Sequence, residues 1–302
     1  MKQLFFILIF ISSIGTLFAQ NDFLVTQYLH NRYAINPAFA GSREGLSLFG
    51  SFRKQWQGIT GSPSSQLFTA HSPLRNNQMA VGLSAYNQKF MVAGNSGFSV
   101  TYAYRMQTSD NTWLSFALAP GVSFRNSDWS SISTIEPGDL AFSSNERVVS
   151  PTLGFGTAWY SDRFFAGFSI PSFFYNNAFD GEDTRFSLGD ATYCLTAGYL
   201  FSLGGSWAIQ PSLFMRYNQE LKDITDVNAT MIYDNRFLLG LSYRTTKEAA
   251  VTASFQVDRR LRVAYSYDYS VGKIGTYNRG SHEISIQYDF VHRSGSVNPK
   301  FF

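Results

Sequence analysis

The sequence predicts an all-β protein whose antiparallel strands close into a transmembrane up-and-down β-barrel. Of its 302 residues, 44% are hydrophobic and 17% aromatic, but only 15% are charged, well below the roughly 25% typical of soluble domains. After Gln20, no apolar run is long enough for a membrane-spanning helix. From about Glu44 onward, apolar and polar residues alternate with a period of two instead, which is the pattern of a strand with two different faces.

The N-terminus has the features of a secretory signal peptide, which we place at residues 1–19. Lys2 supplies the positive charge, residues 4–11 form a short apolar core, and small residues follow from Ser12. Cleavage after Ala19 would leave Gln20 as the first residue. The cleavage site lacks a neighbouring cysteine, so a lipid anchor is not expected.

The alternation divides the chain into about fourteen strands, each of roughly nine to twelve residues, the length that a tilted membrane strand needs. The last strand carries four apolar residues on one face and ends on an aromatic residue: Ile284, Ile286, Tyr288 and Phe290. This ending resembles the C-terminal signal that barrel-assembly machinery reads.

The connections between the expected strands alternate in length. The short ones are residues 161–162, 203–205, 234–235 and 258–260, and the longer ones are residues 126–149, 171–189, 218–223 and 270–280. Tight turns on the periplasmic side and long loops on the other are the outer-membrane arrangement. An even strand number places both termini in the periplasm. Residues 245–248 are short on the side where a long loop is expected.

The second face of the strands is polar. A charge facing lipid costs roughly 2–4 kcal/mol at mid-bilayer, so the charged residues on this face are expected in a wet or salt-bridged lumen. They are Arg53, Arg105, Arg125, Arg216, Arg244, Arg262, Asp268, Glu283 and Asp289. A soluble β-sandwich explains the alternation equally well, but it explains the aromatic outer faces and the loop lengths poorly. His282 and Glu283, with Arg262 and Asp268, are interpreted as a salt-bridge network that ties the closing strands.

Motifs for catalysis, cofactors or metals are missing from the sequence. The single cysteine, Cys194, excludes a cysteine-based zinc cluster, and the four histidines lack metal-ligand spacing. Residues 180–183 form an acidic loop without the spacing of a calcium-binding loop. The net charge of +3 without a Lys/Arg run argues against nucleic acid. We therefore expect neither an enzyme nor a cofactor.

Three segments of the sequence form a specific combination: INPAFAGS at residues 35–42, RKQW at residues 53–56 and GSHEI at residues 280–284. With them, the sequence resembles the PorP/SprF family of type IX secretion system outer-membrane proteins. The resemblance runs from about residue 23 to the C-terminus. Thr192-Tyr193 depart from the His-Tyr that the family often has. The resemblance implies a bacterium of the Bacteroidota group and an outer-membrane barrel that supports secretion or cell-surface attachment of secreted proteins, including gliding adhesins. Its implied partners are this cargo, periplasmic components of the secretion machine and outer-membrane lipid.

Within this frame, residues 20–43 form an N-terminal periplasmic or plug segment, residues 44–290 the barrel, and residues 291–302 a periplasmic tail. Asn36, Pro37 and Gly41 cannot continue a strand, so their segment either plugs the lumen or caps its periplasmic mouth. Asn36 and Pro37 are also candidate partner-binding residues. Trp56 either binds cargo or sits in the aromatic girdle. The tail ends in four residues that we interpret as a docking segment for a periplasmic partner: Pro299, Lys300, Phe301 and Phe302.

Three functions remain to be compared. The first is an assembly or binding component of type IX secretion. The alternative is a diffusion channel or hydrophobic-compound transporter, which conductance in planar bilayers would reveal. An outer-membrane hydrolase is the least supported, because the sequence lacks a recognisable nucleophile constellation.

Overall fold

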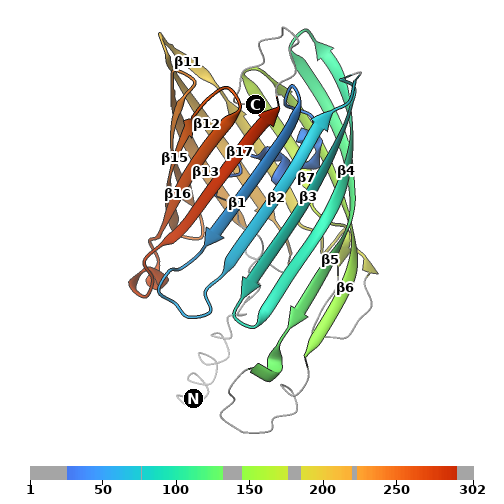
Figure 1. Ribbon diagram of the computed structural model, residues 1–302, viewed down its shortest axis with the longest axis vertical. Coiled ribbons are helices and arrows are strands. Elements are labelled where there is room, and N and C mark those ends of the chain that lie inside the picture. The colour runs from blue at the N-terminus through green and yellow to red at the C-terminus, as the bar shows by residue number, and fades with distance from the viewer. Residues whose placement is uncertain (1–25, 76, 132–144, 176–184, 220–222, 291–302) are drawn as a thin grey trace, which may run out of the picture.

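The computed structural model describes residues 26–75, 77–131, 145–175, 185–219 and 223–290. Fourteen antiparallel strands form a closed barrel (Figure 1), which confirms the predicted fold class. Consecutive strands pair with each other, and the ring closes where β1 pairs with β17, for example Phe52 with Ile284. The predicted signal peptide and the C-terminal tail lie outside the described residues.

The strands of the barrel have the following bounds: β1 (Leu46–Lys54), β2 (Ser64–Pro73), β3 (Met79–Phe90), β4 (Ala93–Ser109), β5 (Thr112–Ser127), β6 (Glu146–Ser161), β7 (Phe164–Ile170), β10 (Tyr193–Tyr199), β11 (Phe201–Gly204), β12 (Trp207–Tyr217), β13 (Ile224–Tyr233), β14 (Phe237–Arg244), β15 (Glu248–Gln256), β16 (Leu261–Ser270) and β17 (Ser281–Phe290). A break at Leu200 divides one barrel strand into β10 and β11, which both pair with β12. A separate two-stranded hairpin, β8 (Phe174–Tyr175) and β9 (Arg185–Phe186), lies in a long loop.

Three strands are longer than the sequence predicted. β4, β5 and β6 contain 17, 16 and 16 residues, and β5 and β6 extend past their neighbours at the lower end of the barrel (Figure 1). Arg125 and Glu146 lie in these extensions and are exposed. The backbone pairing of β5 and β6 continues there as far as Ser127 and Glu146, beyond the apolar residues that face the membrane. The alternation of apolar and polar residues therefore did not mark where these strands end. The prediction that Arg125 lies in the lumen is therefore wrong, because its side chain is exposed beyond the end of the barrel wall.

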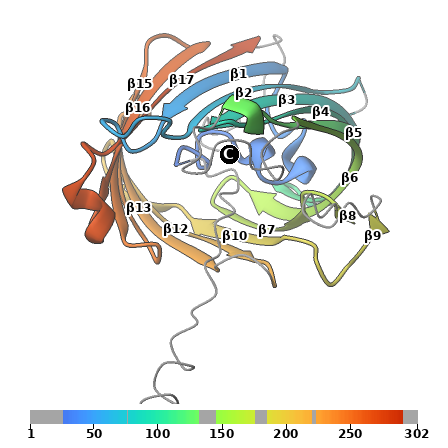
Figure 2. The same ribbon diagram turned by 90° about the horizontal axis from the view of Figure 1, so that it is seen from below.

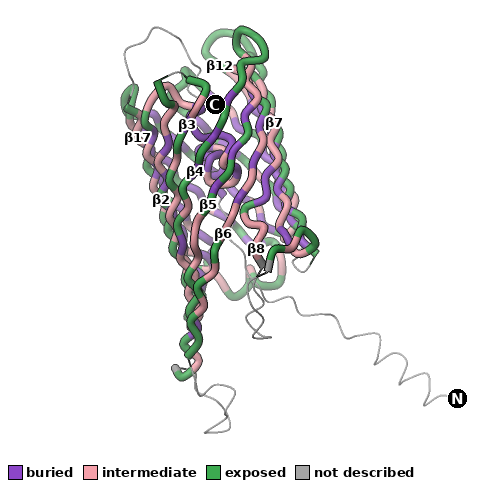
Figure 3. Tube along the Cα trace, turned by 90° about the vertical axis from the view of Figure 1, so that its right-hand side faces the viewer, coloured by how far each residue is buried: buried purple, intermediate pink, exposed green. Residues whose placement is uncertain are grey.

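The two faces of the wall differ as expected for a barrel in lipid. Outward side chains are exposed and apolar, such as Phe52 at 45% and Val100 at 52%. Inward side chains are buried and largely polar, so burial alternates along the strands (Figure 3). An exposed apolar belt around a polar interior is the reverse of a soluble protein and is typical of a transmembrane barrel. Among the described residues, no helix is long and apolar enough to cross a membrane.

Short and long connections gather at opposite ends of the barrel. The upper end in Figure 1 carries the turns at residues 74–78, 110–111, 162–163, 205–206, 234–236 and 257–260. At the lower end, the longer connections join β1 to β2, β5 to β6, β7 to β10, β12 to β13 and β16 to β17, and two short connections lie at residues 91–92 and 245–247. We call these the short-turn end and the long-loop end. β1 begins and β17 ends at the short-turn end, as an even strand number requires.

The described residues before β1, Thr26 to Gly45, lie inside the ring of strands (Figure 2). They contain two short 3-10 turns, η1 (Arg32–Ala34) and η2 (Pro37–Phe39). We call residues 26–45 the plug. Two further 3-10 turns, η3 (Trp129–Ser131) and η5 (Lys273–Thr276), lie in loops at the long-loop end.

Candidate functional site: the plugged lumen

The plug folds as tight turns because its sequence cannot form a strand. Asn36 accepts a hydrogen bond from the Ala38 backbone N–H at 2.9 Å, and Pro37 occupies the first position of η2, where a missing N–H costs nothing. Gly41 has a φ of +70°, in the left-handed region that favours glycine. The Gly41 N–H donates to His71 Nδ1 on β2 at 3.1 Å. These turns keep the segment compact within the lumen.

Glycines on the inner face of the wall make room for the plug. A Cβ at Gly82 on β3 would collide with the Tyr33 hydroxyl, and one at Gly156 on β6 would collide with the Asn36 side chain. At Gly167 on β7, an added Cβ would lie 2.7 Å from Asn36 Nδ2. Since real Cβ atoms do not approach so closely, the wall accepts this plug only because these positions lack a side chain.

Hydrogen bonds tie the middle of the plug to strands around the ring. Tyr33 donates to Thr101 on β4 and Asn31 donates to Thr69 on β2, both at 2.8 Å. Asn36 Nδ2 donates to the backbone oxygens of Thr157 on β6 and Phe168 on β7, at 3.0 and 3.2 Å. Buried polar groups without partners are costly, so this pattern specifies one position of the plug in the lumen.

Aromatic packing adds to the contacts of the plug with β6 and β7. Phe39 lies between two aromatic rings of the wall, with centroids 5.7 Å from Tyr160 and 6.3 Å from Phe165. The guanidinium of Arg32 lies 3.8 Å from the centroid of the Phe165 ring, a cation–π geometry. This packing supplies the apolar part of the barrel interior.

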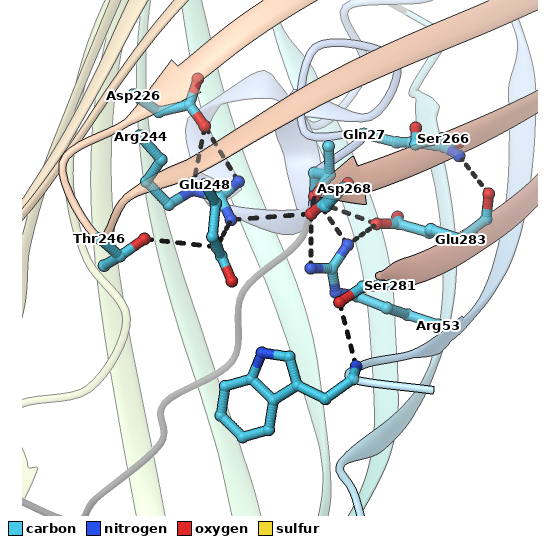
Figure 4. Close-up of polar contacts among 12 residues, drawn as sticks. Gln27, Arg53, Asp226, Arg244, Thr246, Glu248, Ser266, Asp268, Ser281 and Glu283 are labelled. Carbon is cyan, nitrogen blue, oxygen red and sulfur yellow. Dashed lines mark hydrogen bonds and ion pairs between the residues drawn. The ribbon is translucent and has the colours of Figure 1, made fainter. Parts of the chain in front are cut away.

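At the long-loop end, Arg53 joins the plug to the strands that close the barrel (Figure 4). Its guanidinium donates to Asp268 on β16 at 2.7 Å and to Glu283 on β17 at 3.2 Å. Thr26 of the plug enters the same cluster, because its N–H donates to Glu283 at 3.0 Å and its hydroxyl donates to Asp268 at 2.6 Å. Gln27 also contacts Ser285 of β17. The first described residue therefore lies at the long-loop end, whereas Phe290, the last, lies at the short-turn end. The even strand number places the start of β1 at the short-turn end, but the plug before β1 runs through the lumen to the opposite end.

A second arginine extends this cluster along the wall. Arg244 on β14 lies 2.9 Å from Asp226 on β13, 2.8 Å from Glu248 on β15 and 3.9 Å from Asp268. Four carboxylates thus share two arginines, and all six residues are buried. Removing one member of such a set leaves a charge buried without compensation. We call these six residues the acidic cluster: Arg53, Asp226, Arg244, Glu248, Asp268 and Glu283.

Two residues of the predicted salt-bridge network lie elsewhere. Arg262 is buried near the short-turn end, where its Nε donates to Gln256 at 2.9 Å, so it does not join Asp268 and Glu283. His282 has the outward parity of β17 and lies 2.6 Å from the Tyr265 hydroxyl through Nδ1. The interpretation of both as members of the network was wrong. Six positions separate Arg262 from Asp268 on one strand, about 20 Å at 3.4 Å per residue, so both cannot reach Glu283.

The short-turn half of the lumen is basic. Arg105 donates to the Tyr160 hydroxyl at 3.0 Å and lies 4.7 Å from the Trp113 ring. Within the plug, burial and the nearby positive charges of Arg262, Arg32 and Arg43 together lower the pKa of the His30 imidazole to about 3. His30 is therefore neutral at ordinary pH.

The predicted partner-binding residues have different environments. Asn36 is buried and bound to the wall, and Pro37 begins η2 beside it. Trp56 follows β1 at the long-loop end with a φ of 45°, and its backbone N–H donates to Ser281 at 3.2 Å. Its indole N–H is buried, whereas a girdle tryptophan presents this group to the headgroups. Pro299, Lys300, Phe301 and Phe302 lie outside the described residues.

The sequence did not identify Thr26, Gln27, Tyr33 or the three wall glycines as parts of this site. The glycines carry a signal, because each interrupts the inward face of a strand. Within the described part of the chain, no group of three His, Cys, Asp or Glu residues has the geometry to hold a metal ion.

A closed barrel with an apolar exterior and a polar, internally plugged lumen is a transmembrane protein of the outer-membrane type. The family described as "Type IX secretion system membrane protein PorP/SprF" matches residues 17–288. The chain belongs to this family and is an outer-membrane component of the type IX secretion system. The resemblance seen in the sequence is thereby confirmed.

Solved structures of similar fold are outer-membrane channels. CymD, a monoaromatic hydrocarbon channel, is 12% identical, with 90% of this chain and 94% of that chain covered and a TM-score of 0.53. The toluene transporter TbuX of Ralstonia pickettii is 10% identical, with 86% and 92% covered and a TM-score of 0.51. At these identities the similarity shows the fold alone. No curated protein sequence matches the chain. The family and these barrels are secretion and transport components rather than enzymes.

Proposed function

We propose that this barrel is a plugged scaffold that supports the secretion or cell-surface attachment of specific secreted proteins, such as adhesins. In this proposal the long loops face the cell surface and present the binding surface for cargo. The short turns and the end of β17 face the periplasm, where the other components of the secretion machine are.

The observation that carries the proposal is the attachment of the plug to opposite sides of the wall. Thr26 binds β16 and β17, and Asn36 binds β6 and β7, which lie about halfway around the ring from them. Asn31 and Tyr33 bind β2 and β4, which lie between these two attachments. A lumen crossed by a segment held in this way is not a route for a folded secreted protein. The barrel would therefore act on cargo through its loops.

The test is a clean deletion of the gene, followed by comparison of the secreted and surface proteomes with those of the wild type. Loss of one or a few large surface proteins would identify a scaffold dedicated to that cargo. Retention of the whole type IX cargo set in the periplasm would identify a component needed for all secretion. Unchanged secretion and surface display would overturn the proposal.

The fold shared with CymD and TbuX favours a second function, a channel for small hydrophobic compounds. Uptake of a monoaromatic hydrocarbon and conductance in planar bilayers separate the two functions. A scaffold is nearly silent in both assays, whereas a channel that uses the lumen conducts or takes up the compound. Uptake that depends on this gene, with cargo display unchanged, would favour the channel.

A further inference from the structure

The outer wall is hollowed near the short-turn end. A groove of about 610 Å³ crosses β12 to β17 there and is lined mainly by outward apolar side chains, among them Trp207, Phe237, Leu239, Phe255 and Tyr265. These strands lie at the left of the barrel in Figures 1 and 2. We propose that the groove binds one anionic phospholipid, with an acyl chain in the groove and the phosphate at the arginines of the adjoining turns.

A small residue makes the hollow. On β15, Ala253 faces outward between Leu239 of β14 and Tyr265 of β16, to which it is directly paired. Phe255, two residues further along the same face, is again large. A single methyl group among large side chains leaves a depression, and its apolar lining favours a hydrocarbon chain over a polar group.

Aromatic rings border the end of the groove nearest the turns. The centroids of Trp207 and Tyr233 are 4.5 Å apart, those of Tyr233 and Phe237 are 6.5 Å apart, and those of Phe237 and Phe255 are 4.9 Å apart. Tryptophan and tyrosine favour the depth of the lipid headgroups in a membrane. The groove therefore begins at headgroup depth and continues toward the hydrocarbon layer, as a bound phospholipid requires.

Three arginines lie in the two turns that adjoin this end of the groove. Arg236 lies in the turn between β13 and β14, and Arg259 and Arg260 lie in the turn between β15 and β16. All three are exposed. The backbone positions are fixed, since the Arg236 oxygen accepts from the Gln256 N–H at 2.9 Å and the Arg260 oxygen accepts from the Asp289 N–H, also at 2.9 Å.

The local charge favours an anion. Two carboxylates, Asp234 and Asp258, lie in the same turns as the three arginines. Asp258 accepts hydrogen bonds from the backbone N–H groups of Arg260 and Leu261 at 2.7 and 2.8 Å. By contrast, the turns at residues 110–111 and 205–206 of the same end carry no basic residue. Guanidinium groups bind phosphate oxygens through paired hydrogen bonds. The site thus combines an apolar groove with a phosphate-binding rim, which a zwitterionic lipid satisfies less well.

Native mass spectrometry of the full-length barrel in mild detergent tests the site with three probes: phosphatidylglycerol, phosphatidylethanolamine and lipid A. We expect one phosphatidylglycerol to be retained in preference to phosphatidylethanolamine. Changing the three arginines together, R236Q/R259Q/R260Q, should weaken this retention by about tenfold or more, because the charge-assisted hydrogen bonds to the phosphate are lost. Ala253→Phe should have a similar effect, because the new ring fills the groove.

Matched controls lie on the same surface outside the groove. Arg163→Gln changes an exposed arginine of another turn at the same end, and Ala197→Phe adds a ring to the outward face of β10. Both controls should retain phosphatidylglycerol like the wild type. Heat-dependent gel mobility establishes that each variant is a folded barrel. Equal retention of the two phospholipids, retention unaffected by the arginine and Ala253 changes in folded protein, or preferential retention of lipid A would each overturn the proposal.

Discussion

The guanidinium of Arg53 on β1 lies 2.7 Å from the carboxylate of Asp268 on β16, although 215 residues separate the two in the chain. β17 lies between these strands, so the ion pair crosses the closure of the barrel. Thr26 binds the same carboxylate through its hydroxyl at 2.6 Å. One pair therefore joins the first strand, the penultimate strand and the plug.

Replacing this arginine should weaken both the plug and the closure. In Arg53→Met, Asp268 loses its closest guanidinium and Glu283 loses its ion pair, so we expect a loss of about 3–5 kcal/mol in stability. Urea unfolding in detergent measures this loss, and hydrogen exchange at residues 26–31 reports the plug separately. Arg163→Met, at an exposed turn position, serves as the control. Equal stability of the two variants would contradict a structural role for the acidic cluster.

Gly156→Val should displace the plug while leaving the barrel closed. The new side chain occupies the space of the Asn36 side chain, and overpacking of this kind costs about 1–3 kcal/mol. Single-channel recording should show higher conductance than the wild type. Gly50→Ala is the control, because a Cβ at Gly50 meets no atom within 4 Å. Identical conductance, with unchanged exchange of the plug amides, would show that the plug does not depend on this contact.

Asn36→Ala should loosen η2. The substitution removes the acceptor for the Ala38 N–H and the donor to two strand carbonyls, and loss of such a cap costs about 0.5–2 kcal/mol. Asn36→Asp keeps the acceptor but loses the donor and adds a buried charge, so we expect it to be more harmful. Hydrogen exchange at Ala38 and Phe39 measures both effects. Asn87→Ala, at an exposed position of β3, should leave the exchange unchanged.

The proposed orientation has a direct test by cysteine labelling. The one native cysteine, Cys194, is buried and should give little background. Tyr277→Cys, at a position 78% exposed in a long loop, should react with a membrane-impermeant maleimide on intact cells. Asp110→Cys, in a short turn, should react only after the outer membrane is permeabilised. The opposite pattern would place the short turns at the cell surface.

Period-two alternation was enough to predict the strand number and the two faces of the wall, because lipid outside and polar groups inside impose a strong contrast on neighbouring residues. The same alternation correctly assigned Arg53 and Arg244 to the inner face. Arg262 and Asp268 lie on one strand, and their separation of six positions, about 20 Å, already shows that both cannot reach Glu283. Which of the two lies near Glu283 depends on the register between β16 and β17, which the pattern of a single strand does not contain.

The plug was harder to predict. Asn36, Pro37 and Gly41 excluded a strand, but they left plug and cap as alternatives because a turn-rich segment suits either. The deciding contacts are between Tyr33 or Asn36 and inward glycines on β3, β6 and β7. They come from strands far apart in the sequence, and only the closed ring brings them together.

The position of the plug before the first strand constrains the order of assembly. A segment enclosed by a ring either enters before the ring is complete or threads through it afterwards. Thr26 binds β16 and β17, the last strands to be synthesised, so these contacts wait for nearly the entire chain, and such long-range contacts form slowly. The final pairing of β17 with β1 and the placement of the N-terminal segment in the lumen therefore depend on each other. A folding intermediate without the plug in its lumen would lack the Thr26 hydrogen bonds that stabilise the pairing of β17 with β1.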